Sequence, residues 1–335
     1  SAAAWYGLGR CYQSLSQAAF ENLAKIAPGS AYWLALVAES NAKADKYSSA
    51  FYLYRQALDK MPGLYGVHQA VAQIYRATGH PQWAAIEAGQ ERQPDCNRQA
   101  LECDFLSGRF EQVAYAPGDS PEAYYWKSRA YDRLALQAFL RLTRLPPSPQ
   151  LHELMAELHE ASHDYPVAAQ EWRIAYQLSG HNPEIGTHLA AALLHDSDNA
   201  GAQQLLEAIL RKEPRSAHVN YLLGFALLNL QEARQAIPYL RMALDVDPNL
   251  LTARRELGRA YLQTGQNTRA ISELMAALAL DSDGSLHYQL ARAYLATGQR
   301  QLAARMLQVY ERMHQADAQN AETLKQEVRV TPPSR

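Results

Sequence analysis

The sequence predicts an all-α fold in which helix pairs stack on one another to form a solenoid. Three observations lead to this prediction. A pattern recurs about every 34 residues, the first half of each period carries a large–small–aromatic stripe, and the second half carries a small–large–small stripe. Both stripes have the spacing of one face of an α-helix. One helix pair cannot bury both stripes alone, so the pairs must stack.

The repeat is clearest in the second half of the chain. Leu223-Gly224 and Leu257-Gly258 lie 34 residues apart, and Leu290-Ala291 follows 33 residues later. Other units are led by Met155-Ala156, Leu189-Ala190, Val37-Ala38 and Val71-Ala72. Because the small residue has little side chain, it lets the second helix of the pair approach the first closely.

Turn and stop residues fall at fixed places in these units. Gly79, Gly265 and Gly298 each follow a threonine, at the point where the first helix must end. Prolines that stop the second helix follow at Pro62, Pro214 and Pro248. Each period therefore predicts two short helices joined by a tight turn.

These units resemble tetratricopeptide repeats, both in the 34-residue period and in the order Leu-Gly, Tyr, Ala, Leu, Ala that begins at Leu257. The resemblance is strong over residues 149–307 and fair over 31–94. It implies a right-handed α-solenoid of about nine or ten helix pairs. It also implies that the first helices line a concave groove that binds a peptide or a segment of a partner protein.

The pattern predicts four regions, namely an N-terminal repeat block at 1–91, an irregular linking segment at 92–120, a C-terminal array at 121–312, and a capping helix with a frayed tail at 313–335. Short helices are expected in the linking segment at 99–106 and 110–115.

Two stretches depart from the repeat in the same way. Residues 10–28 resemble residues 129–147, which indicates a duplicated larger block. In both stretches the turn between the two helices has been lost, and no Gly or Pro interrupts the pattern. Each is therefore expected to form one long or kinked helix.

Composition excludes several classes of protein. Lys+Arg 32 against Asp+Glu 34 gives a formal charge of −2, so a generally basic nucleic-acid binder is excluded. No apolar run approaches the length of a membrane helix.

The three cysteines lack a CxxC pair. Cys96 and Cys103 would be too far apart for a disulfide on one helix, and the cysteines leave the redox compartment open. The chain begins inside a helical pattern, which suggests that an upstream segment, such as a targeting segment, was removed.

One motif points to an enzyme. Residues 159–163 match HExxH, in which His159 and His163 would hold zinc and Glu160 would act as base. The repeat argues against this interpretation, because His159 occupies the slot of Tyr261 in its sister unit and His163 occupies the turn slot of Gly265. A structural histidine and a loop histidine are the favoured interpretation.

The repeat register predicts which residues line the groove. An acidic band is expected at Glu153 and Glu157, an aromatic band at Tyr221 and Phe225, and a basic band at Arg255, Arg259 and Arg292, with Tyr288 beside the last. Arginines on adjacent helices can bind a carboxylate or phosphate bidentately, and aromatic residues are common binding anchors.

We therefore expect a non-catalytic scaffold that has no cofactor and binds another protein or peptide, but neither nucleic acid nor the membrane interior. The alternative is a zinc-dependent hydrolase, or the accessory domain of an enzyme, that uses the HExxH match. Self-association through the solenoid ends or grooves is a third possibility.

Overall fold

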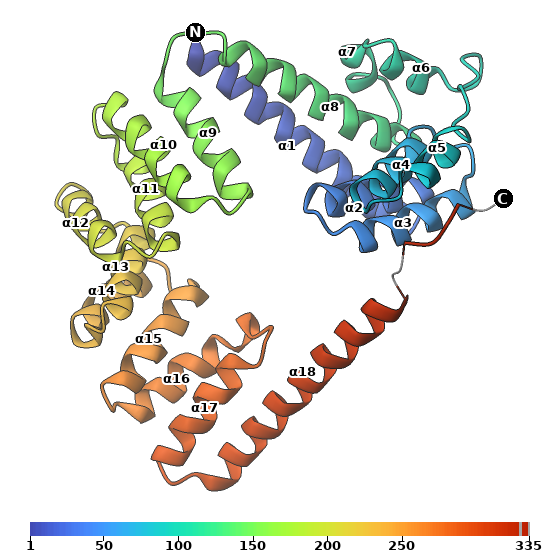
Figure 1. Ribbon diagram of the computed structural model, residues 1–335. Coiled ribbons are helices and arrows are strands. Elements are labelled where there is room, and N and C mark those ends of the chain that lie inside the picture. The colour runs from blue at the N-terminus through green and yellow to red at the C-terminus, as the bar shows by residue number, and fades with distance from the viewer. Residues whose placement is uncertain (328–329, 334–335) are drawn as a thin grey trace. The chain divides into compact units, whose positions relative to one another are not determined.

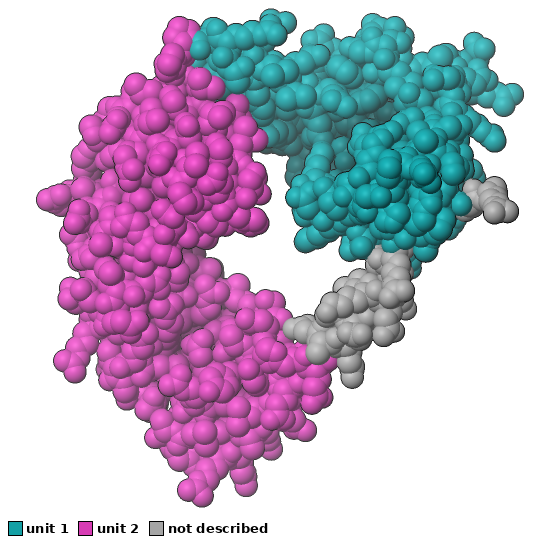
Figure 2. All heavy atoms as spheres, in the orientation of Figure 1, with its two compact units in different colours: residues 1–145, 322–335 teal, residues 146–321 magenta. Residues whose placement is uncertain are grey.

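The computed structural model describes the backbone of residues 1–327 and 330–333, and the side chains of residues 1–315 and 330–333. Over that part of the chain all regular secondary structure is helical, as Figure 1 shows. This confirms the all-α prediction and the stacked helix pairs. No helix within the described residues is both long and apolar enough to cross a bilayer. The chain divides into two compact units, residues 1–145 with 322–335 (unit 1) and residues 146–321 (unit 2) (Figure 2).

Unit 1 contains eight helices over residues 1–145, each with the bounds that follow. They are α1 (Ala2–Ile26), α2 (Ala31–Lys43), α3 (Tyr47–Lys60), α4 (Val67–Ala77), α5 (Pro81–Ala88), α6 (Ala100–Leu106), α7 (Phe110–Ala114) and α8 (Pro121–Leu142). The two short helices α6 and α7 confirm those expected in the linking segment.

The two stretches without an inter-helix turn form single long helices, as predicted. Helix α1 runs for 25 residues and α8 for 22 residues without a break. They pack side by side in opposite directions, with Ser16 Oγ 3.0 Å from Ser128 Oγ, and Gly9 against the ring of Phe139. A Cβ atom on Gly9 would lie 2.3 Å from that ring, so the glycine allows the two helices to approach this closely.

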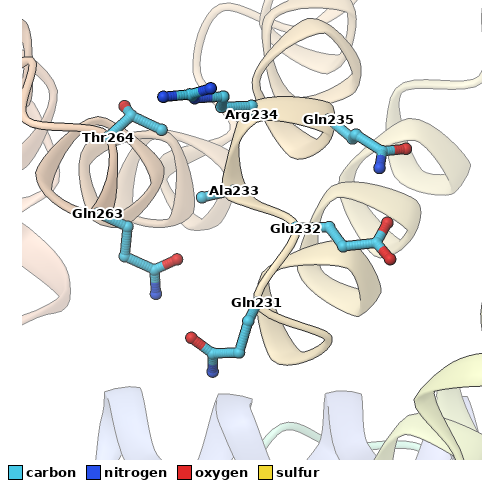
Figure 3. Close-up of a pocket in the computed structure, with 7 residues that line it drawn as sticks. All are labelled: Gln231, Glu232, Ala233, Arg234, Gln235, Gln263 and Thr264. Atoms are coloured by element: carbon cyan, nitrogen blue, oxygen red, sulfur yellow. The ribbon is translucent and has the colours of Figure 1, made fainter.

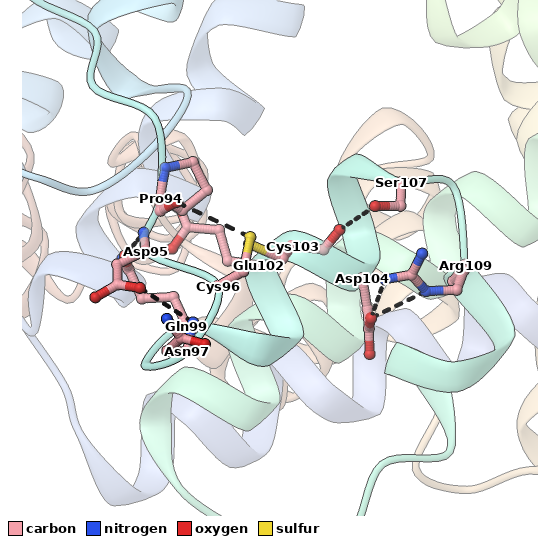
Figure 4. The surroundings of a disulfide bond; sticks show 10 residues. All are labelled: Pro94, Asp95, Cys96, Asn97, Gln99, Glu102, Cys103, Asp104, Ser107 and Arg109. Atoms are coloured by element: carbon pink, nitrogen blue, oxygen red, sulfur yellow. Dashed lines mark hydrogen bonds and ion pairs between the residues drawn. A yellow bond between two sulfur atoms is a disulfide. The ribbon is translucent and has the colours of Figure 1, made fainter.

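The linking segment holds a disulfide where the sequence predicted none. Cys96 and Cys103 are bonded, with their Cα atoms 5.6 Å apart (Figure 4). The distance argument against this pair applied only to two cysteines on one helix, and they do not share one. Helix α6 starts only at Ala100, and Cys96 lies in a turn closed by hydrogen bonds from the amides of Arg98 and Gln99 to the carbonyl of Asp95. The turn folds the chain back, which brings Cys96 within disulfide reach.

Unit 2 is a run of helix pairs. Its helices are α9 (Pro149–Ala161), α10 (Tyr165–Leu178), α11 (Pro183–His195), α12 (Asn199–Leu210), α13 (Ala217–Asn229), α14 (Ala233–Val246), α15 (Leu251–Gln263), α16 (Asn267–Ala276), η1 (Leu278–Leu280), α17 (Ser285–Ala296) and the first part of α18 (Arg300–Glu327). The buried leucines and alanines of these helices form one continuous core.

The turn positions repeat as regularly as the helices. Gly79, Gly265 and Gly298 have φ angles of +82°, +74° and +77°. The residues at the same place in other units adopt the same left-handed conformation without being glycine, with φ angles of +56° to +67°; they are Asp45, His163, Ser197 and Gln231. The turn geometry is therefore set by the helix pairing, and glycine is the residue that adopts it at least cost.

The end of the chain differs from the expectation of a separate capping helix. Residues 313–327 continue α18 without a break, and residues 328–329 and 334–335 of the predicted cap and tail lie outside the described residues. Val330 and Thr331 contact unit 1. Val330 packs against the core of that unit, and the Tyr75 hydroxyl donates to the Thr331 carbonyl over 2.7 Å.

Candidate functional site

The predicted groove residues lie on four first helices of unit 2. Each pair is spaced i, i+4, so both members lie on one face of their helix. The pairs are Glu153 and Glu157 on α9, Tyr221 and Phe225 on α13, Arg255 and Arg259 on α15, and Tyr288 and Arg292 on α17.

A buried carboxylate that was not among the predicted groove residues organises the two arginines of α15. Glu256 is 3% exposed. Its Oε1 accepts from Arg255 Nε over 2.9 Å, and its Oε2 accepts from Arg259 Nη1 over 3.0 Å. Hydrogen bonds between charged groups are stronger than neutral ones. Glu256 therefore holds both guanidinium groups in place.

Arg259 also connects neighbouring repeats. Its Nη2 donates to Asn229 Oδ1 over 2.9 Å, and Asn229 Nδ2 donates to Asn199 Oδ1 over 2.9 Å. Asn229 is the last residue of α13 and Asn199 the first of α12. A chain of hydrogen bonds thus runs across three consecutive repeats and fixes the arginine relative to all of them.

The aromatic pair lies against this polar network. The Arg259 guanidinium lies 5.9 Å from the centre of the Phe225 ring, and the Tyr221 ring lies 6.4 Å from that of Phe225. Burial raises the pKa of Tyr221, and the nearby Glu256 carboxylate acts in the same direction. The phenol therefore stays neutral at physiological pH. Tyr221, Phe225, Arg255, Arg259 and Glu256 make one cluster, named here the α13–α15 cluster.

The other predicted groove residues do not take part in these contacts. Tyr288 and Arg292 are exposed on α17, and the Tyr288 ring lies 5.4 Å from that of Tyr310. Glu153 and Glu157 are half-buried on α9, and each interacts with another group of the chain. The structure thus brings together the aromatic band and two of the three predicted arginines.

The HExxH match is not arranged as a metal site. Helix α9 ends at Ala161, so His163 lies beyond it, in a turn with φ +58°, as its place in the repeat predicted. His159 Nδ1 lies 3.4 Å from Asp164 Oδ2. Glu160, the would-be base, accepts a hydrogen bond from Trp172 Nε1 over 2.8 Å. Within the described residues, no group of three or more His, Cys, Asp or Glu side chains is placed to hold a metal ion.

A hollow at the turns of unit 2 is a weaker candidate. It lies between the α13–α14 turn and the end of α15, and it is lined by Gln231, Glu232, Ala233, Arg234, Gln235, Gln263 and Thr264. In Figure 3 these side chains point in several directions and do not converge on a shared point. Ligand sites hold a few polar groups that do converge, so the hollow is not assigned a ligand.

The repeat pattern could have identified Glu256 as a buried charged residue. Leu222 occupies the equivalent slot one repeat earlier and is 6% exposed. A glutamate that is buried as this leucine is must find partners within the protein. The neighbouring arginines could have been recognised as those partners, whereas the contact of Arg259 with Asn229 depends on how adjacent repeats pack.

Comparisons with known proteins agree with this architecture. Tetratricopeptide-repeat profiles match residues 193–249 and 256–283. Bacteriophage adsorption protein A of Escherichia coli (strain K12) is 25% identical over 212 residues, which are 58% of this chain and 21% of that protein. The chain therefore spans about a fifth of the length of this relative.

Two solved structures are similar to part of the chain. MamA 41-end from Desulfovibrio magneticus RS-1 is 19% identical, with a TM-score of 0.46, over 50% of this chain and 96% of that one. A crystal structure of MamA protein is 18% identical, with a TM-score of 0.44, over 55% of this chain and 98% of that one. The matched repeat profiles, the 34-residue period and the stacked helix pairs agree with one another, and the chain contains tetratricopeptide repeats.

Proposed function

We propose that this chain is a non-catalytic scaffold that binds a segment of a partner protein on the first helices of unit 2. The observation that carries the proposal is the α13–α15 cluster, in which a buried glutamate and an asparagine hold two half-exposed arginines beside two aromatic rings. Side chains fixed before binding lose less entropy when a partner arrives.

The chemistry of the cluster suggests what the partner segment contains. Two arginines against one glutamate leave a net positive charge, and exposed Arg292 on the next first helix adds another. The rings of Tyr221 and Phe225 offer apolar contact area. We therefore propose a segment that combines an acidic residue with an apolar one.

Site-specific photocrosslinking tests the face that binds. A photoreactive phenylalanine analogue is placed at Phe225 or Tyr288, and at Met242 as a control on a second helix, where the side chain is 41% exposed. Partners from a lysate of the source cells should crosslink to the first two positions and not to Met242. Equal crosslinking from all three positions would contradict the proposal.

Charge reversal at an exposed position gives a second test with a matched control. Arg292→Glu should weaken capture of the crosslinked partner at least tenfold. Arg241→Glu makes the same charge change on α14, where Arg241 is also exposed, and should leave capture unchanged. Arg255 and Arg259 are less suitable, because their reversal would leave Glu256 unpaired. Stoichiometric zinc that is lost in the His159→Ala, His163→Ala double variant would instead support the hydrolase alternative.

A further inference from the structure

The surface around Tyr75 in unit 1 binds a stretch of the chain far away in sequence. Tyr75 lies on α4, and the segment that it contacts, residues 330–333, is the sequence Val-Thr-Pro-Pro. The Tyr75 hydroxyl donates to the Thr331 carbonyl over 2.7 Å, and Val330 packs against the apolar core of unit 1. The segment is not helical.

We propose that this surface is a peptide-binding site for extended, proline-containing segments, and that residues 330–333 of the same chain are its built-in ligand. The proposal concerns unit 1 and does not rest on the groove proposed in unit 2. It makes the segment a competitor of any partner peptide with the same chemistry.

Tyr75 lies among other aromatic residues of unit 1. The Tyr75 ring lies 5.5 Å from that of Phe51 and 5.7 Å, edge-on, from that of Trp83. His80 stacks on Trp83 at 4.1 Å. Grooves lined with aromatic residues recognise proline-rich segments in other folds, because such segments are already extended before they bind.

Tyr75 contacts a main-chain atom of the segment, the Thr331 carbonyl oxygen. A carbonyl is the acceptor, so the hydrogen bond does not depend on a particular side chain. Pro332 disfavours the helical conformation at Thr331, and neither Pro332 nor Pro333 has an amide hydrogen that needs a partner. Burial raises the pKa of Tyr75 to about 12, so its hydroxyl keeps the proton that it donates.

The burial of Tyr75 supports the same conclusion. Tyr75, Tyr261 and Tyr294 occupy equivalent slots in their repeats, yet Tyr75 is 0% exposed whereas Tyr261 is 6% and Tyr294 8% exposed. Tyr75 is therefore more completely buried than its counterparts. The hydroxyl, which is the one polar group of its side chain, is used by the 330–333 segment.

Binding of a labelled peptide tests the site. The probe is a fluorescein-labelled decapeptide with the sequence of residues 326–335, titrated by fluorescence anisotropy. The full chain with Val330→Asp should release its own segment, because a charge in the apolar site is costly. It should bind the probe at least tenfold more tightly than the unaltered chain, in which the segment competes at high effective concentration.

Two controls make the test specific. In the Val330→Asp background, Tyr75→Phe should weaken binding at least fivefold, whereas Tyr261→Phe, the same change in the equivalent slot of unit 2, should have no effect. A probe in which both prolines are replaced by alanine should also bind at least fivefold more weakly. Equal affinity of the unaltered and Val330→Asp chains, or equal effects of the two tyrosine variants, would overturn the proposal.

Hydrogen exchange provides a second measurement that leaves the segment unaltered. The amides of residues 330 and 331 should exchange faster in the Tyr75→Phe chain than in the Tyr261→Phe chain, provided that both retain their circular dichroism spectra. No difference would overturn the proposal. A concentration-dependent dimer that Tyr75→Phe abolishes would overturn the assignment of the ligand to the same chain, because the segment would then come from a second copy.

Discussion

Gly224 of α13 lies so close to Leu240 of α14 that a Cβ atom at Gly224 would be 2.5 Å from Leu240 Cγ. Leu240 is fully buried within the core of unit 2, so it cannot move aside without disturbing its neighbours. Gly258 and Leu274 stand in the same relation one repeat later, at 2.7 Å. At these two positions the small residue of the repeat thus lets the paired helices approach closely.

Gly224→Ala should therefore destabilise unit 2. Overpacking of a well-packed core costs about 1–3 kcal/mol, which exceeds the gain in helix propensity from glycine to alanine. Differential scanning calorimetry should show a lower Tm. Gly7→Ala is the control, because Gly7 is also inside a helix and a Cβ atom there meets nothing within 4 Å. That variant should be neutral or more stable, and a Tm loss of the same size in both would contradict the explanation.

Glu256→Ala should loosen the α13–α15 cluster as well as lower stability. The change removes the acceptor of two charged hydrogen bonds, so two half-buried arginines lose a hydrogen-bond partner. We expect the free energy of unfolding to fall by about 1–3 kcal/mol. Thermal unfolding measures the loss. Arg98→Ala breaks an ion pair whose arginine is 87% exposed, and should change the stability by less than about 0.5 kcal/mol. Equal effects of the two variants would show that the buried network is not stabilising.

Glu102 should make unit 1 less stable as the pH rises. Burial, together with the nearby Glu122 and Glu91, raises the pKa of this glutamate from 4.5 to about 7. Between these two values the folded state binds more protons than the unfolded state, so stability falls with increasing pH, by up to about 1.4 kcal/mol per pH unit.

Glu102→Gln should flatten this dependence. Gln99 Nε2 donates to Glu102 Oε2 over 2.8 Å, whereas the buried Oε1 has no partner within the described part of the chain. Thermal unfolding at pH 5 and pH 8 should show a smaller difference in the variant than in the unaltered chain. An unchanged difference would place the titrating group elsewhere.

The Cys96–Cys103 disulfide should stabilise the segment between α5 and α8. Closing so short a loop restricts the unfolded chain by about 2–3 kcal/mol. Cys96→Ser with Cys103→Ser should lower the Tm of unit 1 and leave that of unit 2 unchanged. Peptide mass mapping without reductant should find the two cysteines linked and Cys11, which is exposed and free, unlinked. A linked pair that contains Cys11 would contradict the structure.

Much of the candidate site followed from the register of the repeat. The i, i+4 spacing of Tyr221 with Phe225, and of Arg255 with Arg259, is enough to place each pair on one helix face. Glu256 lies next to Arg255 but was missed, because the groove was predicted from exposed slots and the equivalent Leu222 in the preceding repeat is buried. The Arg259–Asn229 hydrogen bond was beyond the sequence, since it depends on the packing of one repeat against the next.

The sequence by itself determined the architecture. The 34-residue period, the paired stripes and the lost turns at residues 10–28 and 129–147 specify helix pairs and two long helices, because hydrophobic periodicity acts locally along the chain. Tertiary structure decided the disulfide, the α13–α15 cluster and the docking of residues 330–333 at Tyr75. Each of these depends on where a turn or a neighbouring repeat directs a side chain, and contacts between residues as far apart as Tyr75 and Thr331 leave no periodic trace in the sequence.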